Sequence, residues 1–94
     1  DSRSQAVLYV YEREIKSKFH HQGLGHHLMK ATESMAQTAN ISKVMLTVFR
    51  ANGAAMAFYR SMGYSVDESS PSKHGIFTDY EILSKEELWF RAMQ

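Results

Sequence analysis

The first half of the chain alternates between strand-like and helix-like patterns of hydrophobic residues. A β-branched and aromatic run begins at Val7-Leu8-Tyr9-Val10-Tyr11 and continues with alternating character to Ile15, which predicts a first strand. After a polar, basic segment, a long amphipathic helix is predicted, and Asn40 suits its C-terminal end. Its apolar positions recur at helical spacing at Leu24, Leu28, Ala31, Met35 and Ala39.

The middle of the chain predicts a buried strand and a second helix. Val44–Phe49 is a short continuous apolar run, typical of a strand covered on both faces. Asn52 can cap the helix that follows, and Gly63 stands where glycine commonly ends one. The apolar face of this helix is expected to include Ala55, Phe58, Tyr59 and Met62.

Turn-forming residues then separate two further strands, which completes an α/β pattern. Tyr64 begins a third strand, and the turn chemistry of Ser69-Ser70-Pro71-Ser72 and Gly75 predicts a loop over residues 68–78. A fourth strand is predicted at Tyr80–Leu83 and a terminal helix at Lys85–Met93. The order β-α-β-α-β-β predicts one domain over residues 1–94, with a mixed sheet, right-handed crossovers and helices packed on its faces.

Composition narrows the function classes. The formal net charge is +1, from 11 Lys+Arg and 10 Asp+Glu, so no global field favours nucleic acid, and no nucleic-acid partner is expected. No cysteine is present, which excludes disulfides and thiolate chemistry. No run approaches the roughly 18 apolar residues that a membrane span needs, so we expect a soluble protein without a membrane partner. The oligomeric state is left open.

The junction His20-His21-Gln22-Gly23-Leu24-Gly25 is the most informative segment. A strand leads into a glycine-containing loop that opens directly into a long helix. Glycines let the backbone approach an anion, and the free N–H groups of the first helical turn can bind a phosphate. A tight strand-to-helix turn with no ligand explains the same glycines equally well.

Two segments of the chain resemble signatures of the GNAT superfamily of acetyltransferases. The first family signature has the form [Gln/Arg]-x-x-Gly-x-[Gly/Ala]. Gly23 and Gly25 match its two glycine positions, whereas His20 stands at the first position in place of Gln or Arg. The second signature is matched by Asn52, Ala55, Phe58, Tyr59, Gly63 and Tyr64. The resemblance implies a GNAT-like fold and acetyl-CoA as co-substrate, with its pyrophosphate on the backbone of His20, His21, Gln22, Gly23, Leu24 and Gly25.

Further segments resemble the NatD branch of this superfamily, whose members acetylate the N-terminal Ser of certain core histones. These are Val44–Phe49, Asp67 with Ser69-Ser70-Pro71-Ser72, and Tyr80-Glu81-Ile82-Leu83-Ser84. The resemblance implies transfer of acetyl to a protein N-terminal α-amine, histone N-termini as partners, and a cytoplasmic and nuclear location. GNAT domains run to about 150 residues, so the chain is expected to represent the fourth family strand onward, without the N-terminal strands.

The resemblance also assigns roles to individual residues. It places the pantetheine arm along Arg13, Glu14 and Ile15, and it makes Tyr59 the acid that protonates the CoA sulfur, a task suited to a phenol. Packing on a buried helix face is the alternative for Tyr59. Asn52 either contacts the cofactor or only caps its helix.

On the acceptor side, Tyr9 and Tyr11 share one face of their strand, where either could orient the amine or relay its proton. Core packing is their alternative. Tyr80 and Glu81 are expected to border the peptide groove, with edge packing as the alternative.

No metal site is expected. His20, His21, His26 and His27 are close in sequence, but the two on the helix have no His or Glu four residues on, so these histidines are interpreted as solvated. Two other functions stay open. One is a GNAT enzyme for another amine, such as a different protein N-terminus, a lysine or a small molecule; the other is a CoA-binding or interaction module without turnover.

Overall fold

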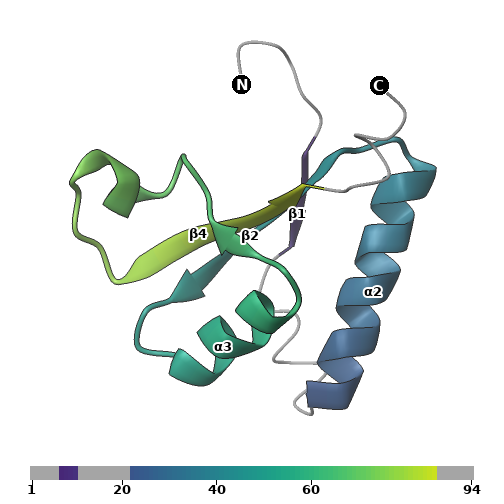
Figure 1. The fold of residues 1–94 in the computed structure, drawn as a ribbon, viewed down its shortest axis with the longest axis horizontal. Coiled ribbons are helices and arrows are strands. Elements are labelled where there is room, and N and C mark those ends of the chain that lie inside the picture. Colours follow the sequence, from purple (N-terminus) through teal and green to yellow (C-terminus); the bar gives the residue numbers. More distant parts are fainter. Residues whose placement is uncertain (1–6, 11–21, 87–94) are drawn as a thin grey trace.

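A computed structural model describes residues 7–10 and 22–86 of the chain. The elements follow in the order β1 (Val7–Val10), α2 (Gln22–Thr38), β2 (Lys43–Phe49), α3 (Gly53–Ser61), β3 (Ser65–Val66), the 3-10 helix η1 (Pro71–His74) and β4 (Tyr80–Glu86) (Figure 1). Residues 11–15 of the predicted first strand and residues 87–93 of the predicted terminal helix lie outside the described residues. None of the described helices is long and apolar enough to cross a membrane.

The described strands form one mixed sheet in the order β1-β2-β4-β3. β1 pairs parallel to β2, with Tyr9 opposite Met45, and α2 makes the crossover between them. β4 runs antiparallel to β2, with Leu83 opposite Leu46, and β3 pairs antiparallel to β4. This confirms the predicted α/β fold with a mixed sheet. The parallel pair β1–β2 needs a long crossover connection, which α2 supplies.

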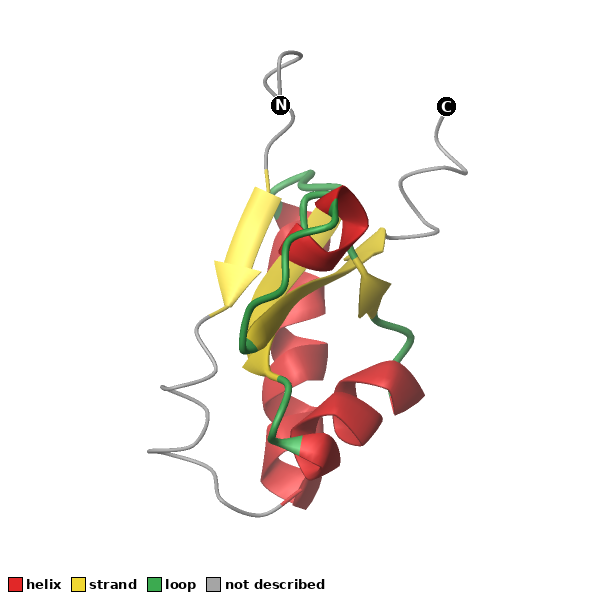
Figure 2. Cartoon of the chain, turned by 90° about the vertical axis from the view of Figure 1, so that its left-hand side faces the viewer, coloured by secondary structure: helices red, strands yellow, loops and turns green. Residues whose placement is uncertain are grey.

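The core lies between one face of the sheet and the two helices. Val44, Leu46 and Val48 of β2 are fully buried, whereas the residues between them are only partly buried. They share a cluster with Met29 and Ala36 of α2 and with Tyr59 of α3. Figure 2 shows α2 crossing behind the strands, with η1 at the front. The prediction that β2 is covered on both faces was therefore wrong for the described part of the chain, because the packed helices bury alternate side chains.

The buried face of α2 differs from the predicted one. Ala31, Met35 and Ala39 are exposed, Met35 by 62%, so the predicted apolar face through these three residues was wrong. The residues that face the sheet are instead Met29, Thr32, Glu33 and Ala36. Two of these four are polar, so counting apolar positions alone selects the wrong side of the helix.

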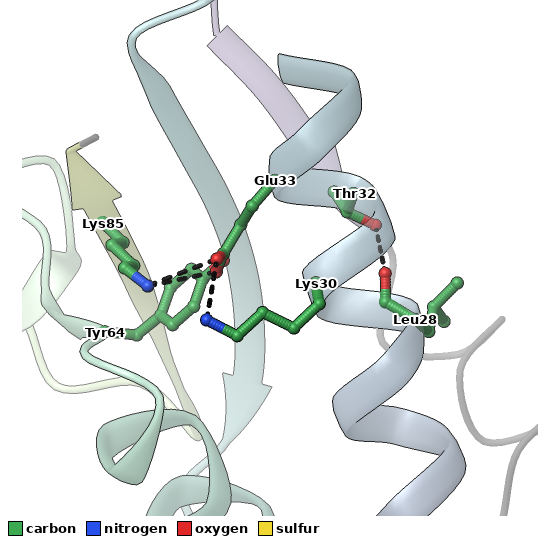
Figure 3. A network of polar contacts seen from close by, with 6 residues as sticks. All are labelled: Leu28, Lys30, Thr32, Glu33, Tyr64 and Lys85. Carbon is green, nitrogen blue, oxygen red and sulfur yellow. Dashed lines mark hydrogen bonds and ion pairs between the residues drawn. The ribbon is translucent and has the colours of Figure 1, made fainter. Parts of the chain in front are cut away.

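The buried polar residues of α2 are hydrogen-bonded. Thr32 Oγ1 donates to the Leu28 carbonyl at 2.9 Å. Glu33 reaches from α2 toward β4 and the start of β3, where it accepts from Tyr64 Oη at 2.9 Å and from Lys85 Nζ at 3.3 Å (Figure 3). A buried carboxylate is tolerated when its oxygens are paired in this way, so Glu33 joins the helix to the sheet.

The ends of both helices are as predicted from sequence. Asn40 adopts a left-handed conformation, with φ 60°, just after α2, and the Ile41 N–H donates to the Ala36 carbonyl at 2.7 Å. Gly63 has φ 97° after α3, and the Tyr64 N–H donates to the Tyr59 carbonyl at 3.0 Å. These bonds satisfy the last carbonyl groups of each helix, as in a Schellman ending.

The C-terminal part departs from prediction in two places. β4 extends to Glu86, so Lys85 lies in a strand and not at the start of a helix. Pairing decides this, because Lys85 and Glu86 lie opposite Val44 and Lys43 of β2. The predicted loop between the last two strands contains η1, which begins at Pro71 and ends at His74 and is followed by Gly75 with φ 71°. Proline favours such a start because its missing N–H is not needed there.

Candidate functional site

The carboxyl ends of the parallel strands lie at the same end of the sheet as the beginnings of both helices. Figure 1 shows the first turn of α2, the first turn of α3 and the arrowhead of β2 at the lower side of the molecule. In open α/β sheets, ligands bind beyond the carboxyl ends of the strands. We refer to this side as the carboxyl edge.

The first turn of α2 is a candidate anion site. The sequence predicted a glycine loop before the helix, but α2 begins at Gln22, so Gly23 and Gly25 lie within its first turn. Glycine destabilises a helix chiefly in its middle, and the first N–H groups of a helix have no intrahelical partner and are free to bind a ligand. No acidic residue occupies this turn, so its N–H groups and the positive end of the helix dipole favour an anion.

Gly25 has a second role, in the contact between the two helices. It is buried, and a Cβ built on it would lie 3.5 Å from the Phe58 ring of α3. This distance is an ordinary contact, so the small size of the residue at this position lets α3 pack against the beginning of α2. This brings the two segments that carry the family signatures together at the carboxyl edge.

Asn52 and Tyr59 belong to α3, beside that contact. Asn52 is the N-cap, and its Oδ1 accepts from the Ala55 N–H at 3.1 Å. Tyr59 is only 2% exposed, and its ring packs edge-on against Phe58 and Tyr64. Capping and core packing are thus observed for these residues, while their contacts with a cofactor stay predictions.

The face of the sheet opposite α2 carries hydroxyl groups. Tyr9 of β1 is hydrogen-bonded through its phenol to Thr47 Oγ1 of β2, and it is 38% exposed. Tyr80 begins β4 on the same face, since it pairs with Phe49 two positions beyond Thr47. Thr47 was missed from the sequence, because a threonine within an apolar run is an ordinary strand residue until the register brings Tyr9 to it.

Glu81 lies on the other face of β4 and joins three segments. It is buried, and its Oε1 accepts from Ser70 Oγ at 2.6 Å and from Ser72 Oγ at 2.7 Å. Its Oε2 lies 3.3 Å from Arg50 Nη1. The hydrogen bonds from the two serines, together with the Arg50 charge, hold the pKa of Glu81 below its usual range although desolvation opposes them.

Asp67 is a second buried carboxylate, at the end of β3. Its Oδ1 lies 2.7 Å from Lys43 Nζ of β2, and its Oδ2 accepts from the Ser69 N–H at 2.9 Å. Burial alone would raise the pKa of Asp67, but the Lys43 ammonium and the hydrogen bonds from Ser69 and Ser84 hold it well below its usual range. Asp67 therefore stabilises the fold as an anion.

An open hollow of about 610 Å³ lies beyond the end of β2. One wall is Phe49, Arg50 and Ala51, and the other is Phe77, Thr78 and Asp79. We call it the Phe49–Phe77 hollow. The guanidinium of Arg50 lies 4.8 Å above the Phe77 ring centre, so a cation–π contact joins the walls. An extended, partly apolar segment suits such a surface.

Several predicted site residues cannot be placed. Tyr11, Arg13, Glu14, Ile15, His20 and His21 lie outside the described residues, and Gln22, Gly23 and Leu24 are placed only as part of α2. His26 and His27 are exposed on α2, as expected of solvated histidines. Over the described ranges 7–10 and 22–86, no group of three metal-binding side chains is found.

Comparison with known proteins agrees with this geometry. The model of the acetyltransferase (GNAT) domain family matches residues 2–84. The match spans β1, β2 and β3, both α-helices, the Phe49–Phe77 hollow and β4 as far as Ser84. GNAT domains use acetyl-CoA for acyl transfer, and a mixed sheet with a helix beginning at the carboxyl edge fits that use. The chain therefore belongs to the GNAT acetyltransferases.

Proposed function

We propose that this protein transfers acetyl from acetyl-CoA to the α-amine of a protein N-terminus, and that the N-terminal Ser of core histones is the acceptor. The observation that carries the proposal is the family match over residues 2–84, which includes the acid-free first turn of α2 at the carboxyl edge. The acceptor class rests on the resemblance to NatD enzymes of Val44–Phe49, of Asp67 with Ser69-Ser70-Pro71-Ser72, and of Tyr80–Ser84. A cytoplasmic and nuclear location is proposed with it.

The residues at the carboxyl edge fit acetyl-CoA. Backbone N–H groups of the first turn of α2, over Gln22–Gly25, would hold its pyrophosphate, with His20 and His21 preceding them in the chain. Arg13, Glu14 and Ile15 would take the pantetheine arm, with Asn52 at the start of α3 beside it. Bound there, acetyl-CoA supplies an activated thioester carbonyl to an amine. Tyr59 is proposed as hydrogen-bond donor to the sulfur.

The acceptor amine would lie on the hydroxyl-bearing face of the sheet. Tyr9 and Thr47 form one hydrogen-bonded pair there, and Tyr11 is predicted to follow on the same strand face. A phenol or an ordered water held by it can orient an amine and take its proton. Tyr80 would border the acceptor on this face, whereas Glu81, whose side chain lies on the other face, would border it only through the segment that leads from η1 to β4.

The test separates cofactor binding from acceptor choice. Binding of acetyl-CoA to the purified chain is measured by calorimetry, beside Gly23→Glu and the neutral control Gly23→Gln. Both substitutions replace a helical glycine and preserve helix formation, but only glutamate places a negative charge at the anion site. We expect Gly23→Glu to weaken binding at least tenfold relative to Gly23→Gln, with equal circular dichroism. Equal affinities would contradict the α2 site.

Acceptor choice is tested by mass spectrometry of peptide products. A histone peptide with a free N-terminal Ser is compared with the same peptide blocked at its α-amine and with a ribosomal-protein N-terminal peptide. Acetylation of only the first is expected. Modification of the blocked peptide on lysine would favour a GNAT enzyme for another amine, and acetyl-CoA binding without any product would favour a CoA-binding module.

A further inference from the structure

Arg50 joins the two walls of the Phe49–Phe77 hollow. The Arg50 N–H donates to the Asp79 carbonyl at 2.8 Å, and its guanidinium covers Phe77. Arg50 therefore contacts the opposite wall twice, once through its backbone and once through its side chain. Phe77 is 82% exposed, so little besides Arg50 fixes its ring.

Arg50 is in turn anchored from the interior by Glu81. The Arg50 side chain is 36% exposed and the Glu81 side chain only 9%, so the ion pair runs from the rim of the hollow into the protein. The other oxygen of Glu81 is occupied by Ser70 and Ser72, which precede the Phe77 wall in the chain. Ser70 Oγ also accepts from the Ile82 N–H at 2.9 Å, which fixes this loop to the edge of β4.

We infer that Glu81 is a positioning residue that sets the shape of the Phe49–Phe77 hollow through Arg50 and the Ser70–Ser72 loop, and thereby controls affinity for the acceptor polypeptide. The inference rests on the proposed function for the identity of the occupant. Glu81 touches neither the acceptor nor acetyl-CoA in this role. Its carboxylate joins β4, the loop before α3 and the loop after β3, so both walls depend on it.

Glu81→Gln tests this role with little change in shape. The amide can still accept the serine hydroxyls at one oxygen, but it loses the charge that pairs with Arg50. We expect KM for the acceptor peptide to rise about tenfold, as for loss of a charged hydrogen bond, while the Kd of acetyl-CoA stays unchanged. Glu33→Gln is the matched control, because it removes a buried carboxylate of similar pairing from the contact between α2 and the sheet. A rise in KM of the same size in Glu33→Gln would overturn the inference.

A double-mutant cycle with Arg50→Met tests whether Glu81 acts on the hollow through Arg50. If Glu81 acts through Arg50, Glu81→Gln adds little to KM in the Arg50→Met background. If the effects of the two substitutions on the free energy that corresponds to KM add fully, Glu81 does not act through Arg50.

Amide hydrogen exchange tests the positioning without any turnover. The backbone N–H of Arg50 donates to the Asp79 carbonyl. Glu81→Gln is expected to speed hydrogen exchange at this N–H about tenfold, because local opening becomes easier. Glu33→Gln is expected to leave this exchange rate unchanged. Unchanged exchange would overturn the role of Glu81. A parent protein that acetylates no peptide would instead contradict the proposed function, while the exchange result would still decide whether Glu81 fixes the hollow.

Discussion

Gly25 of α2 faces the outer end of the Phe58 ring of α3, with 3.5 Å between Phe58 Cζ and the position that a Cβ on Gly25 would take. This distance is an ordinary van der Waals contact, so a methyl group fits there and a longer side chain does not. The contact therefore limits the size of the residue at this position to about that of alanine where the two signature-bearing helices meet at the carboxyl edge.

Gly25→Ala is expected to raise the free energy of unfolding by about 0.5–1 kcal/mol, because alanine loses less backbone entropy in a helix. Gly25→Leu is expected to lower it by about 1–3 kcal/mol through overpacking against Phe58. Urea unfolding followed by circular dichroism measures both. Equal stability of the leucine variant would show that Phe58 can move away at no cost.

Asn52→Ala removes the cap of α3 and is expected to lower the free energy of unfolding by about 1 kcal/mol. Asn52→Asp keeps an oxygen for the Ala55 N–H and is expected to retain stability. If Asn52 also adjoins the cofactor, the added negative charge weakens acetyl-CoA binding in a calorimetric titration. Unchanged affinity in the aspartate variant would leave capping as its role.

Tyr9→Phe is expected to lower kcat for acetyl transfer at least about tenfold, since it removes a hydroxyl that can move a proton, without changing the Kd of acetyl-CoA. Thr47→Val breaks the same hydrogen bond but leaves the phenol in place. A smaller loss of kcat in Thr47→Val than in Tyr9→Phe is therefore expected. Equal kcat in the parent and Tyr9→Phe would assign Tyr9 to packing.

The stability of the protein is expected to fall as the pH drops below about 4. Asp67 has an ordinary pKa of 3.8 when unfolded and a lower one in the fold, so its stabilising contribution is complete above 3.8 and is lost as the pH falls toward the folded-state pKa. The lowered pKa of Glu81 acts in the same direction.

Asp67→Asn is expected to lower the free energy of unfolding at neutral pH by about 2 kcal/mol, because it leaves Lys43 without its charged partner. Asp67→Asn should also make the free energy of unfolding fall less steeply below pH 4, as measured by urea unfolding across a pH series. Glu68→Gln, at an exposed position next to it, serves as the control. An unchanged acid slope in Asp67→Asn would assign the decline to other carboxylates.

Local signals in the sequence predicted much of this fold. Asn40, Asn52 and Gly63 mark helix ends because their preferences arise from backbone geometry within a few residues. The buried face of α2 was not predictable in that way. Glu33 is buried because Tyr64 and Lys85 lie opposite it, and those partners come from distant parts of the chain.

The same limit applies to the site. Gly23 and Gly25 carry a local pattern that indicated the beginning of a helix, and the structure begins α2 there, although the glycines lie inside the first turn; the anion site itself stays a prediction. Thr47 and the serine partners of Glu81 have no such pattern. Their significance depends on the pairing of β2 with β1 and β4, which places Tyr9 and Glu81 beside them.

The position of β2 in the sheet has a consequence for how the protein is made. β2 is flanked on one side by a strand synthesised before it and on the other by a strand synthesised after it, and Lys43 pairs with Glu86 near the far end of the described chain. The apolar run Val44–Phe49 therefore leaves the ribosome long before β4 can cover its second edge. Non-local pairing of this kind slows folding and leaves an interval in which this apolar run is open to aggregation.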